Sequence, residues 1–420
     1  MPKFWLQYGF VIYLCVALAS CGMPQANSEK ANQIANNKTA AQILGDSNYQ
    51  AICYGGYRKL TRDSQPSIEQ VKEDLKILHA MGIKIIRTYN TKYDEVRTIL
   101  QALTTLQQEK PSMEMYMMLG AWIDCEQAWT NTPNHEKEDE QANAAEIDRA
   151  VKLANRYPHI IKIISVGNEA MVKWATNYHV SPGIILKWVN YLQHLKKEKS
   201  LPQGVWVTSS DNFASWGGGD TSYHVADLAK LYQAVDYVSM HTYPMHDTHY
   251  NPEFWKLNKA EKQWNEPKQI DTLLARSLAY AQKQYWSVQQ YMKSIGVNKP
   301  IHIGETGWAS SSDGFYGAEG SRACDEYKSA RYNHLIKNWA NQQKITCFYF
   351  EAFDEQWKDA KNPAGSENHF GLFTMDGKAK YAIWDKVDAG VFNELTRDGH
   401  PIVKTFNGSL NELIKTIKLP

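Results

Sequence analysis

The chain has 420 residues, of which 43% are hydrophobic and 22% charged, and its 46 basic side chains nearly balance its 45 acidic ones. A net charge of +1 provides no broad attraction for polyanions, so we expect no nucleic-acid partner. The composition also excludes a disordered or collagen-like chain and is typical of a folded protein.

The N-terminus has the pattern of an export signal. The apolar stretch Phe10 to Ala19 is short for a membrane span and leads through small residues into Cys21. This arrangement resembles a bacterial lipobox, which implies a lipoprotein signal peptide over residues 1–20 and a lipid-modified Cys21; an ordinary signal peptide is the alternative. Gly22 at the following position implies the outer membrane, with the protein on its periplasmic or cell-surface face. The small, polar residues that follow predict a flexible tether over 21–48.

Four cysteines follow the lipobox, namely Cys53, Cys125, Cys324 and Cys347. An exported protein can keep disulfides, and four cysteines allow three pairings, so both disulfides and buried free thiols stay open. No spacing typical of a zinc site is present, and we expect neither a metal nor a cofactor.

Short apolar runs alternate with longer helical patterns through most of the chain. The predicted strands cover residues 51–57, 84–89, 113–120, 160–167, 205–210, 235–241, 301–305 and 345–350. The predicted helices cover residues 67–81, 94–107, 140–157, 182–198, 271–294 and 325–341. Runs without polar alternation are typical of parallel strands buried on both faces. The α/β pattern therefore predicts a (β/α)8 TIM barrel over 49–420 with a C-terminal extension, and an open doubly wound sheet is the alternative.

Two of the predicted strands lead into a glutamate. The run over 160–167 is followed by Asn168 and Glu169, and the run over 301–305 ends in Glu305. In a barrel of parallel strands both side chains lie at the C-terminal mouth, where such enzymes carry their chemistry. Two carboxyl groups across one mouth are what glycoside cleavage requires, although each could instead cap a helix or form a surface ion pair.

Four motifs give these glutamates a family context. Val166-Gly167-Asn168-Glu169 and Gly304-Glu305-Thr306-Gly307-Trp308 resemble the two signature strands of glycoside hydrolase family 17, the β-1,3-glucanase family. Further matches are Arg87-Thr88-Tyr89 and the segment Phe350 to Lys358, and the similarity covers residues 50–385. The resemblance implies that Glu169 is the general acid/base and Glu305 the nucleophile of a retaining mechanism, for which we expect carboxyl groups about 5–5.5 Å apart.

The resemblance also assigns supporting roles. Arg87, Tyr89 and Tyr243 would point donors at Glu305 and keep it ionised, and their alternative is core and rim packing. Asn168 would donate its amide to a sugar 2-hydroxyl.

The proton of Glu169 requires a partly apolar setting, which Trp174 or Trp308 would supply. Glu355 and Lys358 resemble the family's supporting pair, with an ordinary ion pair as the alternative.

Aromatic residues follow most of the predicted strands and suit the faces of sugar rings. They are Trp122, Trp129, Trp174, Trp216, Trp308 and Trp357, and core packing is the alternative for each. Asp211 and His241 would bond sugar hydroxyls beside them. The irregular segment over 246–269 would close one end of the groove, and its His246, Asp247 and His249 are interpreted as sugar or packing contacts instead of a metal site.

The leading hypothesis is a retaining β-1,3-glucan hydrolase with a polysaccharide or oligosaccharide partner and a lipid anchor in the bilayer. A β-1,3-glucan transglycosylase is the first alternative, since sugar instead of water would intercept the glycosyl-enzyme. A non-catalytic glycan-binding lipoprotein is the second, and the pair Glu169 and Glu305 argues against it. Chain-end or mid-chain cleavage stays open, and we expect a monomer.

Overall fold

The computed structural model describes residues 38–420, in which the eight predicted strands close into one barrel. Each strand pairs in parallel with two neighbours, in the order β1-β10-β9-β8-β7-β6-β3-β2. The strands are β1 (Gln50–Cys53), β2 (Ile83–Arg87), β3 (Tyr116–Ala121), β6 (Ile161–Asn168), β7 (Trp206–Asn212), β8 (Val238–His241), β9 (Ile301–Gly307) and β10 (Cys347–Phe350). The closed sheet confirms the predicted TIM barrel and excludes the open one.

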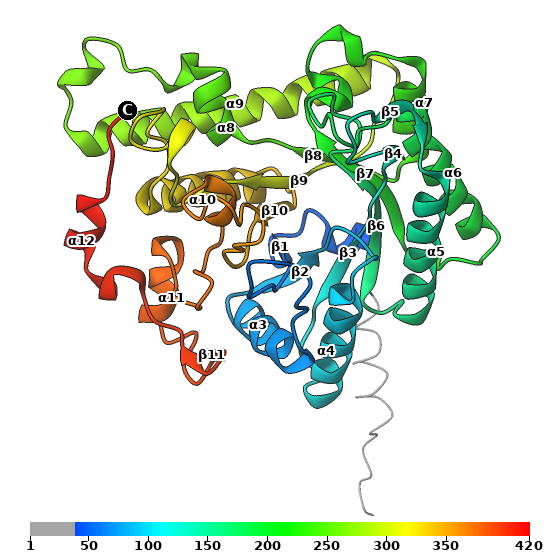
Figure 1. The fold of residues 1–420 in the computed structure, drawn as a ribbon, viewed down its shortest axis with the longest axis horizontal. Helices are drawn as coiled ribbons and strands as arrows, with labels where there is room; N and C mark the ends of the chain where they lie inside the picture. The colour runs from blue at the N-terminus through cyan, green and yellow to red at the C-terminus, as the bar shows by residue number, and fades with distance from the viewer. Residues whose placement is uncertain (1–37) are drawn as a thin grey trace, which may run out of the picture. The chain divides into compact units, whose positions relative to one another are not determined.

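Helices cover the outside of the barrel, as Figure 1 shows for α3 and α4 beside β2 and for α5 and α6 beside β6. They are α3 (Ile68–Ala80), α4 (Glu95–Glu109), α5 (Glu140–Arg156), α6 (Pro182–Lys197), α7 (Ala226–Ala234), α9 (Glu266–Ser294) and α10 (Glu326–Gln342). Side chains of Ser67, Asp139, Asn265 and Asp325 accept the N-terminal amides of their helices, which explains why those helices begin there. Helix α7 is not among the helices predicted from the sequence; it is short and has no side-chain cap.

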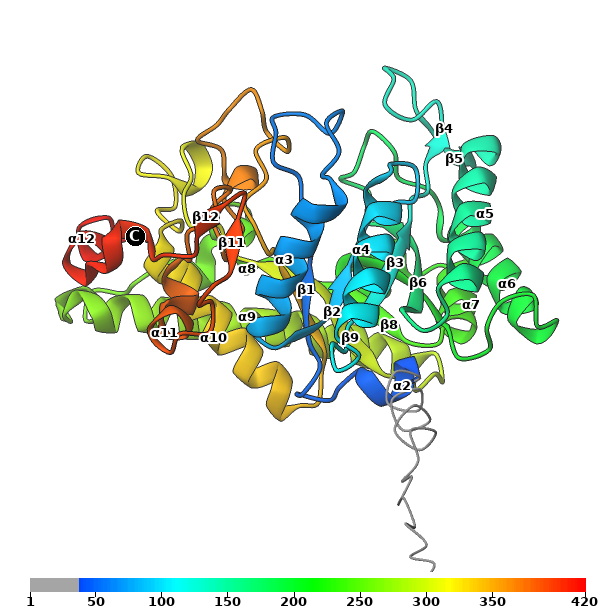
Figure 2. The ribbon, with the colours of Figure 1, turned by 90° about the horizontal axis from the view of Figure 1, so that it is seen from below.

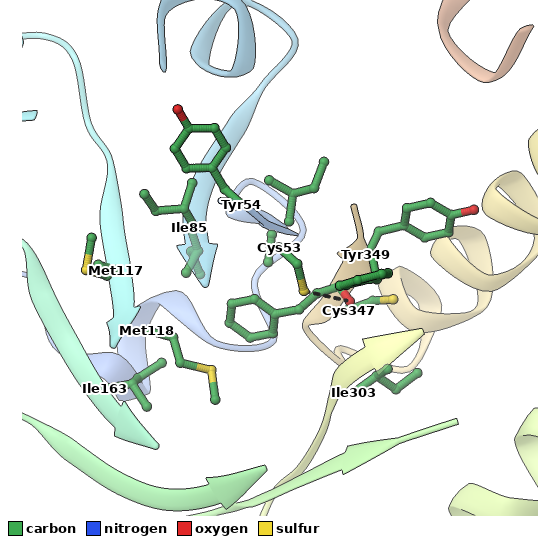
Figure 3. Packing of buried hydrophobic residues seen from close by; sticks show 14 of the residues in the cluster. Cys53, Tyr54, Ile85, Met117, Met118, Ile163, Ile303, Cys347 and Tyr349 are labelled. Carbon is green, nitrogen blue, oxygen red and sulfur yellow. Dashed lines mark hydrogen bonds between the residues drawn. The ribbon is translucent and has the colours of Figure 1, made fainter. Parts of the chain in front are cut away.

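The barrel interior is packed with side chains from neighbouring strands. Figure 3 shows buried side chains of three adjacent strands, among them Met117 and Met118, which are consecutive in β3 and lie on opposite faces of the sheet. Such continuous burial explains why the strands read as uninterrupted apolar runs. All four cysteines of the described chain are buried and free, so the disulfide alternative is wrong for them.

The folded unit begins at Lys38, earlier than the boundary expected from the sequence. Helix α2 (Ala40–Ile43) buries Ala40 and Ile43, and the Gly45 amide donates to the Thr346 hydroxyl at 2.7 Å. Residues 38–48 are therefore packed on the barrel and are not part of a tether. Figure 2 shows α2 at one end of the barrel and the β4–β5 hairpin at the other. Cys21 and the signal segment lie outside the described residues.

Several short elements extend the mouth and the flank. They are β4 (Cys125–Glu126), β5 (Asn134–Glu138), α8 (Pro244–Tyr250), α11 (Trp384–Asp388), β11 (Thr396–Arg397), β12 (His400–Pro401) and α12 (Leu410–Lys415), with a π-helical turn at Ala214–Gly218 and 3₁₀ turns at Thr221–Tyr223, Pro252–Trp255, Glu261–Gln263, Gly314–Tyr316, Ser366–Asn368, Tyr381–Ile383 and Thr405–Gly408. The C-terminal extension packs on the outer helices of the barrel, with β11 against α3 and α12 against α10. Within residues 38–420, no helix has the length and apolar character needed to cross a membrane.

The later part of the irregular segment expected to close the groove lies away from the mouth. After α8 it packs on α9, where the rings of Phe254 and Tyr280 stack with centroids 4.4 Å apart and Glu261 forms an ion pair with Arg276. These contacts place residues 252–263 on the helical layer, so they do not support the predicted wall across the mouth.

Candidate active site

Two carboxylates meet at the C-terminal mouth of the barrel. Glu169 directly follows β6, and Glu305 lies near the end of β9. Their side-chain oxygens and a ring nitrogen of His241, the last residue of β8, all lie within 4.8 Å of one another. One oxygen of each carboxyl group thus lies within 4.8 Å of the other, close enough for both groups to act on the same sugar carbon.

The backbone at the end of β6 has an unusual conformation that positions Glu169. Gly167 and Glu169 have φ values of +78° and +47°, and the pairing of β6 with β7 shifts register between Ser165 and Asn168. A positive φ is unfavourable for a residue with a Cβ and costs roughly 1 kcal/mol or more. The Glu169 amide donates to the Ser210 carbonyl at 2.9 Å, which holds the carboxylate at the mouth.

Glu305 is surrounded by groups that stabilise its ionised form. The Arg87 guanidinium lies 2.9 Å from its carboxylate, the Tyr243 hydroxyl donates to it at 3.0 Å, and the Tyr89 hydroxyl donates as well. Burial raises the pKa of Glu305, but His241, Arg87 and the two tyrosines together hold that pKa below its usual value. Glu305 is therefore ionised at neutral pH.

Glu169 experiences the opposite environment. Burial, followed by the negative charge of Glu305, raises the pKa of Glu169 to about 8. Within residues 38–420 no arginine forms an ion pair with Glu169, and its one side-chain hydrogen bond is with the Nδ1 of His241 at 3.1 Å. Glu169 therefore carries its proton at neutral pH while its neighbour does not.

His241 connects the two carboxylates. Its Nδ1 lies 3.1 Å from Glu169 and 3.3 Å from Glu305, and its Nε2 lies 2.7 Å from the Ser210 hydroxyl. Burial lowers the pKa of His241 to about 4, so the ring is neutral at neutral pH and contributes a hydrogen bond instead of a charge. The sequence predicts that His241 bonds a sugar hydroxyl. In the structure it lies between the two carboxylates instead.

A glycine makes this arrangement possible. A Cβ on Gly304 would lie 2.2 Å from the Ser239 hydroxyl oxygen and 2.3 Å from that of Ser210. These two hydroxyls are hydrogen-bonded to each other at 2.9 Å beneath His241. Gly304 therefore allows β9 to approach the serines that support the histidine.

The three side chains that meet at the mouth are the one group within residues 38–420 whose ligand atoms converge as a metal site would require. Arg87 lies 2.9 Å from the same Glu305 carboxylate, and its fixed positive charge opposes a second cation there. We therefore interpret the cluster as acid–base machinery.

The other histidines near the mouth pack against aromatic rings. His246 stacks on Tyr243 with centroids 5.2 Å apart, and His249 stacks on Phe315 at 4.1 Å. These stacked contacts agree with the packing interpretation made from the sequence.

Arg87 also orients Asn168. It donates to the Asn168 side-chain oxygen at 2.6 Å and to the Gly304 carbonyl at 2.7 Å. Because the amide oxygen is occupied, the NH2 group of Asn168 is left as a donor at the mouth.

A second charged cluster follows β10. Lys358 forms ion pairs with Glu351 and, at 3.2 Å, with Glu355, while the Trp357 indole donates to Glu355 at 3.0 Å. The predicted Glu355–Lys358 pair is thus present, but it includes a third member that the sequence reading did not single out. Glu351 directly follows a buried strand, as Glu169 does, so the same strand-end signal could have identified it.

Two of the predicted sugar-binding tryptophans, Trp216 and Trp308, belong to the core. Trp216 and Trp308 are fully buried, and their indoles donate to the backbone carbonyls of Ser239 and Ala323. Trp174 is 60% exposed, and none of the ring contacts of the described residues involves it. Trp216 and Trp308 are therefore core residues, so Trp308 does not supply the apolar setting of Glu169. No ring contact of the described residues links Trp174 to that setting.

Asp211 supports the site from below instead of facing sugar. It is fully buried and accepts hydrogen bonds from the Ser215 hydroxyl at 2.6 Å and the Met171 amide at 2.7 Å. Burial raises the pKa of Asp211 to about 6. Its bond to Met171 fixes the loop two residues beyond Glu169.

Comparisons with known proteins agree with this geometry. A family model described as the BtgE/BtgC glycoside hydrolase domain matches residues 51–371. A putative glucan endo-1,3-beta-glucosidase, btgC, of Aspergillus niger is 24% identical over 355 residues, which cover 82% of this chain and 44% of that protein. The chain thus spans less than half the length of this fungal relative.

Two solved structures extend the comparison. The crystal structure of an endo-laminarinase from Formosa Hel1_33_131 is 61% identical, with a TM-score of 0.90, and the match covers 91% of this chain and 98% of that one. An active-site mutant of a Rhizomucor miehei beta-1,3-glucanosyltransferase, solved with laminaritriose, is 19% identical with a TM-score of 0.54 and covers 80% and 97%. The second match reflects the shared barrel fold.

Proposed function

We propose that this chain, which belongs to the BtgE/BtgC glycoside hydrolase family, hydrolyses internal linkages of β-1,3-glucan with retention of configuration. The names of the fungal and Formosa relatives support the substrate and the internal position of cleavage. The observation that carries the mechanism is the contrast between two carboxyl groups whose oxygens lie within 4.8 Å, one protonated and one ionised at neutral pH.

In the first step the ionised Glu305 attacks the anomeric carbon, and the bond from that carbon to the glycosidic oxygen breaks. Glu169 gives its proton to the departing oxygen, so the leaving sugar ends as a neutral alcohol. Arg87, Tyr89 and Tyr243 hold Glu305 in place for the attack, and the freed NH2 group of Asn168 supports the sugar 2-hydroxyl.

In the second step Glu169, now ionised, removes a proton from water as the water oxygen attacks the same carbon. The ester bond to Glu305 breaks, both carboxyl groups return to their starting states, and the configuration is retained. His241 lies within hydrogen-bonding distance of Glu169 and about as close to Glu305. As a neutral ring it can form a hydrogen bond with whichever carboxylate is charged at each step, and it does not ionise itself.

We further propose that Cys21 is lipid-modified and anchors the protein to the outer membrane. The lipobox pattern supports this proposal. Gly45, shortly after α2, contacts Lys344 and Thr346, which precede β10 at the end of the barrel away from Glu169 and Glu305.

A time course of products from linear β-1,3-glucan, with laminari-oligosaccharides offered as acceptors, tests the activity. We expect early release of mixed oligosaccharides whose reducing ends appear in the β configuration by NMR. Products longer than the added oligosaccharides would instead identify a transglycosylase, and no change in chain length would support a glycan-binding protein. An α product would contradict retention.

A further inference from the structure

Three aromatic rings gather beside the mouth and are not needed for the chemistry above. Trp129 and Tyr178 are stacked with centroids 5.0 Å apart and planes 18° from parallel, and Trp122 lies 5.0 Å from Tyr178 and 6.4 Å from Trp129. We call Trp122, Trp129 and Tyr178 the aromatic platform. Trp129 is 59% exposed, so a large apolar ring is presented to solvent at this point.

The aromatic platform is held rigidly from beneath. One carboxylate oxygen of Asp124 accepts both indole N–H groups, from Trp122 at 2.8 Å and from Trp129 at 3.2 Å. The Trp129 amide donates to the Asn177 carbonyl at 2.8 Å, and the Cys125 amide donates to the Tyr178 carbonyl at 3.2 Å. Two loops are thereby joined into one surface.

Trp129 is fixed in a conformation that costs free energy. Its φ is +65°, in the left-handed region that residues with a Cβ avoid. A tryptophan gains little for folding from being both exposed and strained, and such outliers concentrate at functional sites. The exposure and strain of Trp129 together indicate a ring that is positioned for a ligand.

The aromatic platform lies on the Glu169 side of the site. Trp122 directly follows β3, which pairs with β6 on the flank opposite β7, and Tyr178 ends a loop that begins after Glu169. That loop closes where the Val180 amide donates to the Ala170 carbonyl at 2.7 Å. Burial and then the charges of Glu169 and Asp211 raise the pKa of the Tyr178 hydroxyl, which agrees with its place beside the mouth.

We propose that the aromatic platform is a subsite for glucosyl units on the leaving-group side of the cleaved bond. This proposal rests on the proposed hydrolase function. Glu169 would contact the departing oxygen, so rings beside it face the part of the chain that departs. The apolar face of a pyranose fits a flat aromatic surface. The second carboxylate oxygen of Asp124 takes part in none of the hydrogen bonds of the described residues, and it can accept one from a sugar hydroxyl.

Binding can be measured apart from catalysis in a Glu305→Gln background, by calorimetry with laminarihexaose. Adding Trp129→Ala is expected to weaken binding about tenfold, which corresponds to a loss of roughly 1.4 kcal/mol of binding free energy from the ring contact. Trp129→Phe keeps an aromatic ring and should recover part of that affinity. Trp286→Ala is the matched control, because Trp286 is a 43% exposed tryptophan on the distant helix α9, and it should change nothing.

The outcomes separate the two proposals. If the Glu305→Gln parent fails to bind laminarihexaose and the wild type releases nothing from β-1,3-glucan, the proposed function is wrong. If the parent binds and Trp129→Ala binds equally well, the function stands and the subsite is overturned. Thermal melting of each variant identifies a loss of binding that comes from misfolding, and in that case the Trp129→Phe comparison decides.

The leaving-group side is tested with the active enzyme. An aryl β-laminaribioside has no sugar beyond the cleaved bond, whereas laminarihexaose has. Trp129→Ala should therefore lower kcat/KM for laminarihexaose about tenfold more than kcat/KM for the aryl substrate. Equal losses on both substrates would overturn the assignment of side.

Discussion

The ends of β6 and β9 can be compared directly, because each presents one buried glutamate to the same mouth. At the β9 end, an arginine and two tyrosine hydroxyls face Glu305 and keep it ionised. At the β6 end, no lysine or arginine of residues 38–420 forms an ion pair with Glu169, and burial together with the negative charge of Glu305 raises its pKa, so it keeps its proton. Burial alone would raise the pKa of both side chains.

The difference shows that the neighbours, and not the depth of burial, assign the roles. Glu305 has three strong donors, Arg87 and two tyrosine hydroxyls, whereas Glu169 has none of that strength. This difference makes one of two identical side chains the proposed nucleophile and the other the proposed acid. His241 lies between the two carboxylates, and its interaction with Glu305 is among those that lower the Glu305 pKa. Changes to either end should therefore produce effects that differ in kind as well as in size.

The largest effect is expected at the β9 end. Glu305→Ala removes the proposed nucleophile and should lower kcat about 10⁵-fold or more on laminarin while oligosaccharide binding is kept. Added azide can replace the nucleophile and should yield the α-glycosyl azide, which NMR identifies. Glu253→Ala, on an exposed turn, is the matched control and should be fully active. Equal loss of binding in Glu305→Ala would mean that Glu305 is structural.

The corresponding change at the β6 end should be smaller and should depend on the substrate. Glu169→Ala removes the acid, so we expect about 10²- to 10⁴-fold slower turnover of glucosides with poor leaving groups and a much smaller loss with activated aryl groups. Azide should now attack the glycosyl-enzyme and give the β-glycosyl azide. If the two variants gave each other's anomer, the assignment of acid and nucleophile would be reversed.

Removing one donor from Glu305 should sharpen the contrast through pH. Tyr243→Phe deletes a hydrogen bond to a charged group, worth roughly 1.5–3 kcal/mol, so kcat/KM should fall about 10- to 100-fold. Activity requires ionised Glu305 and is lost as pH falls through its pKa; loss of a donor raises that pKa and moves the acid limb to higher pH. The basic limb reflects Glu169, near pH 8, and should stay in place.

The matched control is Tyr191→Phe, on the outer helix α6. It should leave the bell-shaped pH profile of kcat/KM unchanged. A basic limb that moved with Tyr243→Phe while the acid limb stayed fixed would contradict the separate roles of the two ends.

Much of this comparison could be predicted from the sequence. Uninterrupted apolar runs indicated the eight barrel strands, and the glutamates that end two of them indicated the site, because strand ends of a parallel barrel share one mouth. The motif resemblance also predicted that Arg87, Tyr89 and Tyr243 face Glu305, and the observed contacts agree.

What the sequence could not predict depends on which way a side chain points. Trp216 and Trp308 follow strands at the correct end but turn into the core, and nothing in their spacing distinguishes them from Trp129, which is exposed. Tyr178 joins the aromatic platform through a loop closure that brings it to Trp129 from 49 residues away, so local patterns contain no signal for it.

The last prediction compares the two ends by stability, where the same substitution should have opposite signs. Glu305→Gln leaves the buried Arg87 without its partner charge, so the free energy of unfolding should fall by about 3–5 kcal/mol at pH 7. Glu169→Gln removes a carboxyl group whose pKa in the folded protein is raised to about 8. A raised pKa means that ionisation disfavours the folded state, so the substitution should stabilise the protein at high pH, by up to roughly 5 kcal/mol for a shift from 4.5 to about 8.

The pH dependence makes the sign decisive. Below about pH 4 the Glu169 carboxyl is protonated in both the folded and unfolded states, so Glu169→Gln should have little effect there. The gain should grow as pH rises, since unfolded chains ionise first, and it should level off above about pH 8, where the folded carboxyl has also ionised. Urea unfolding from pH 4 to 9 measures both variants. If Glu169→Gln were destabilising across this range, Glu169 would have a stabilising partner like that of Glu305, and the contrast between the two strand ends would be wrong.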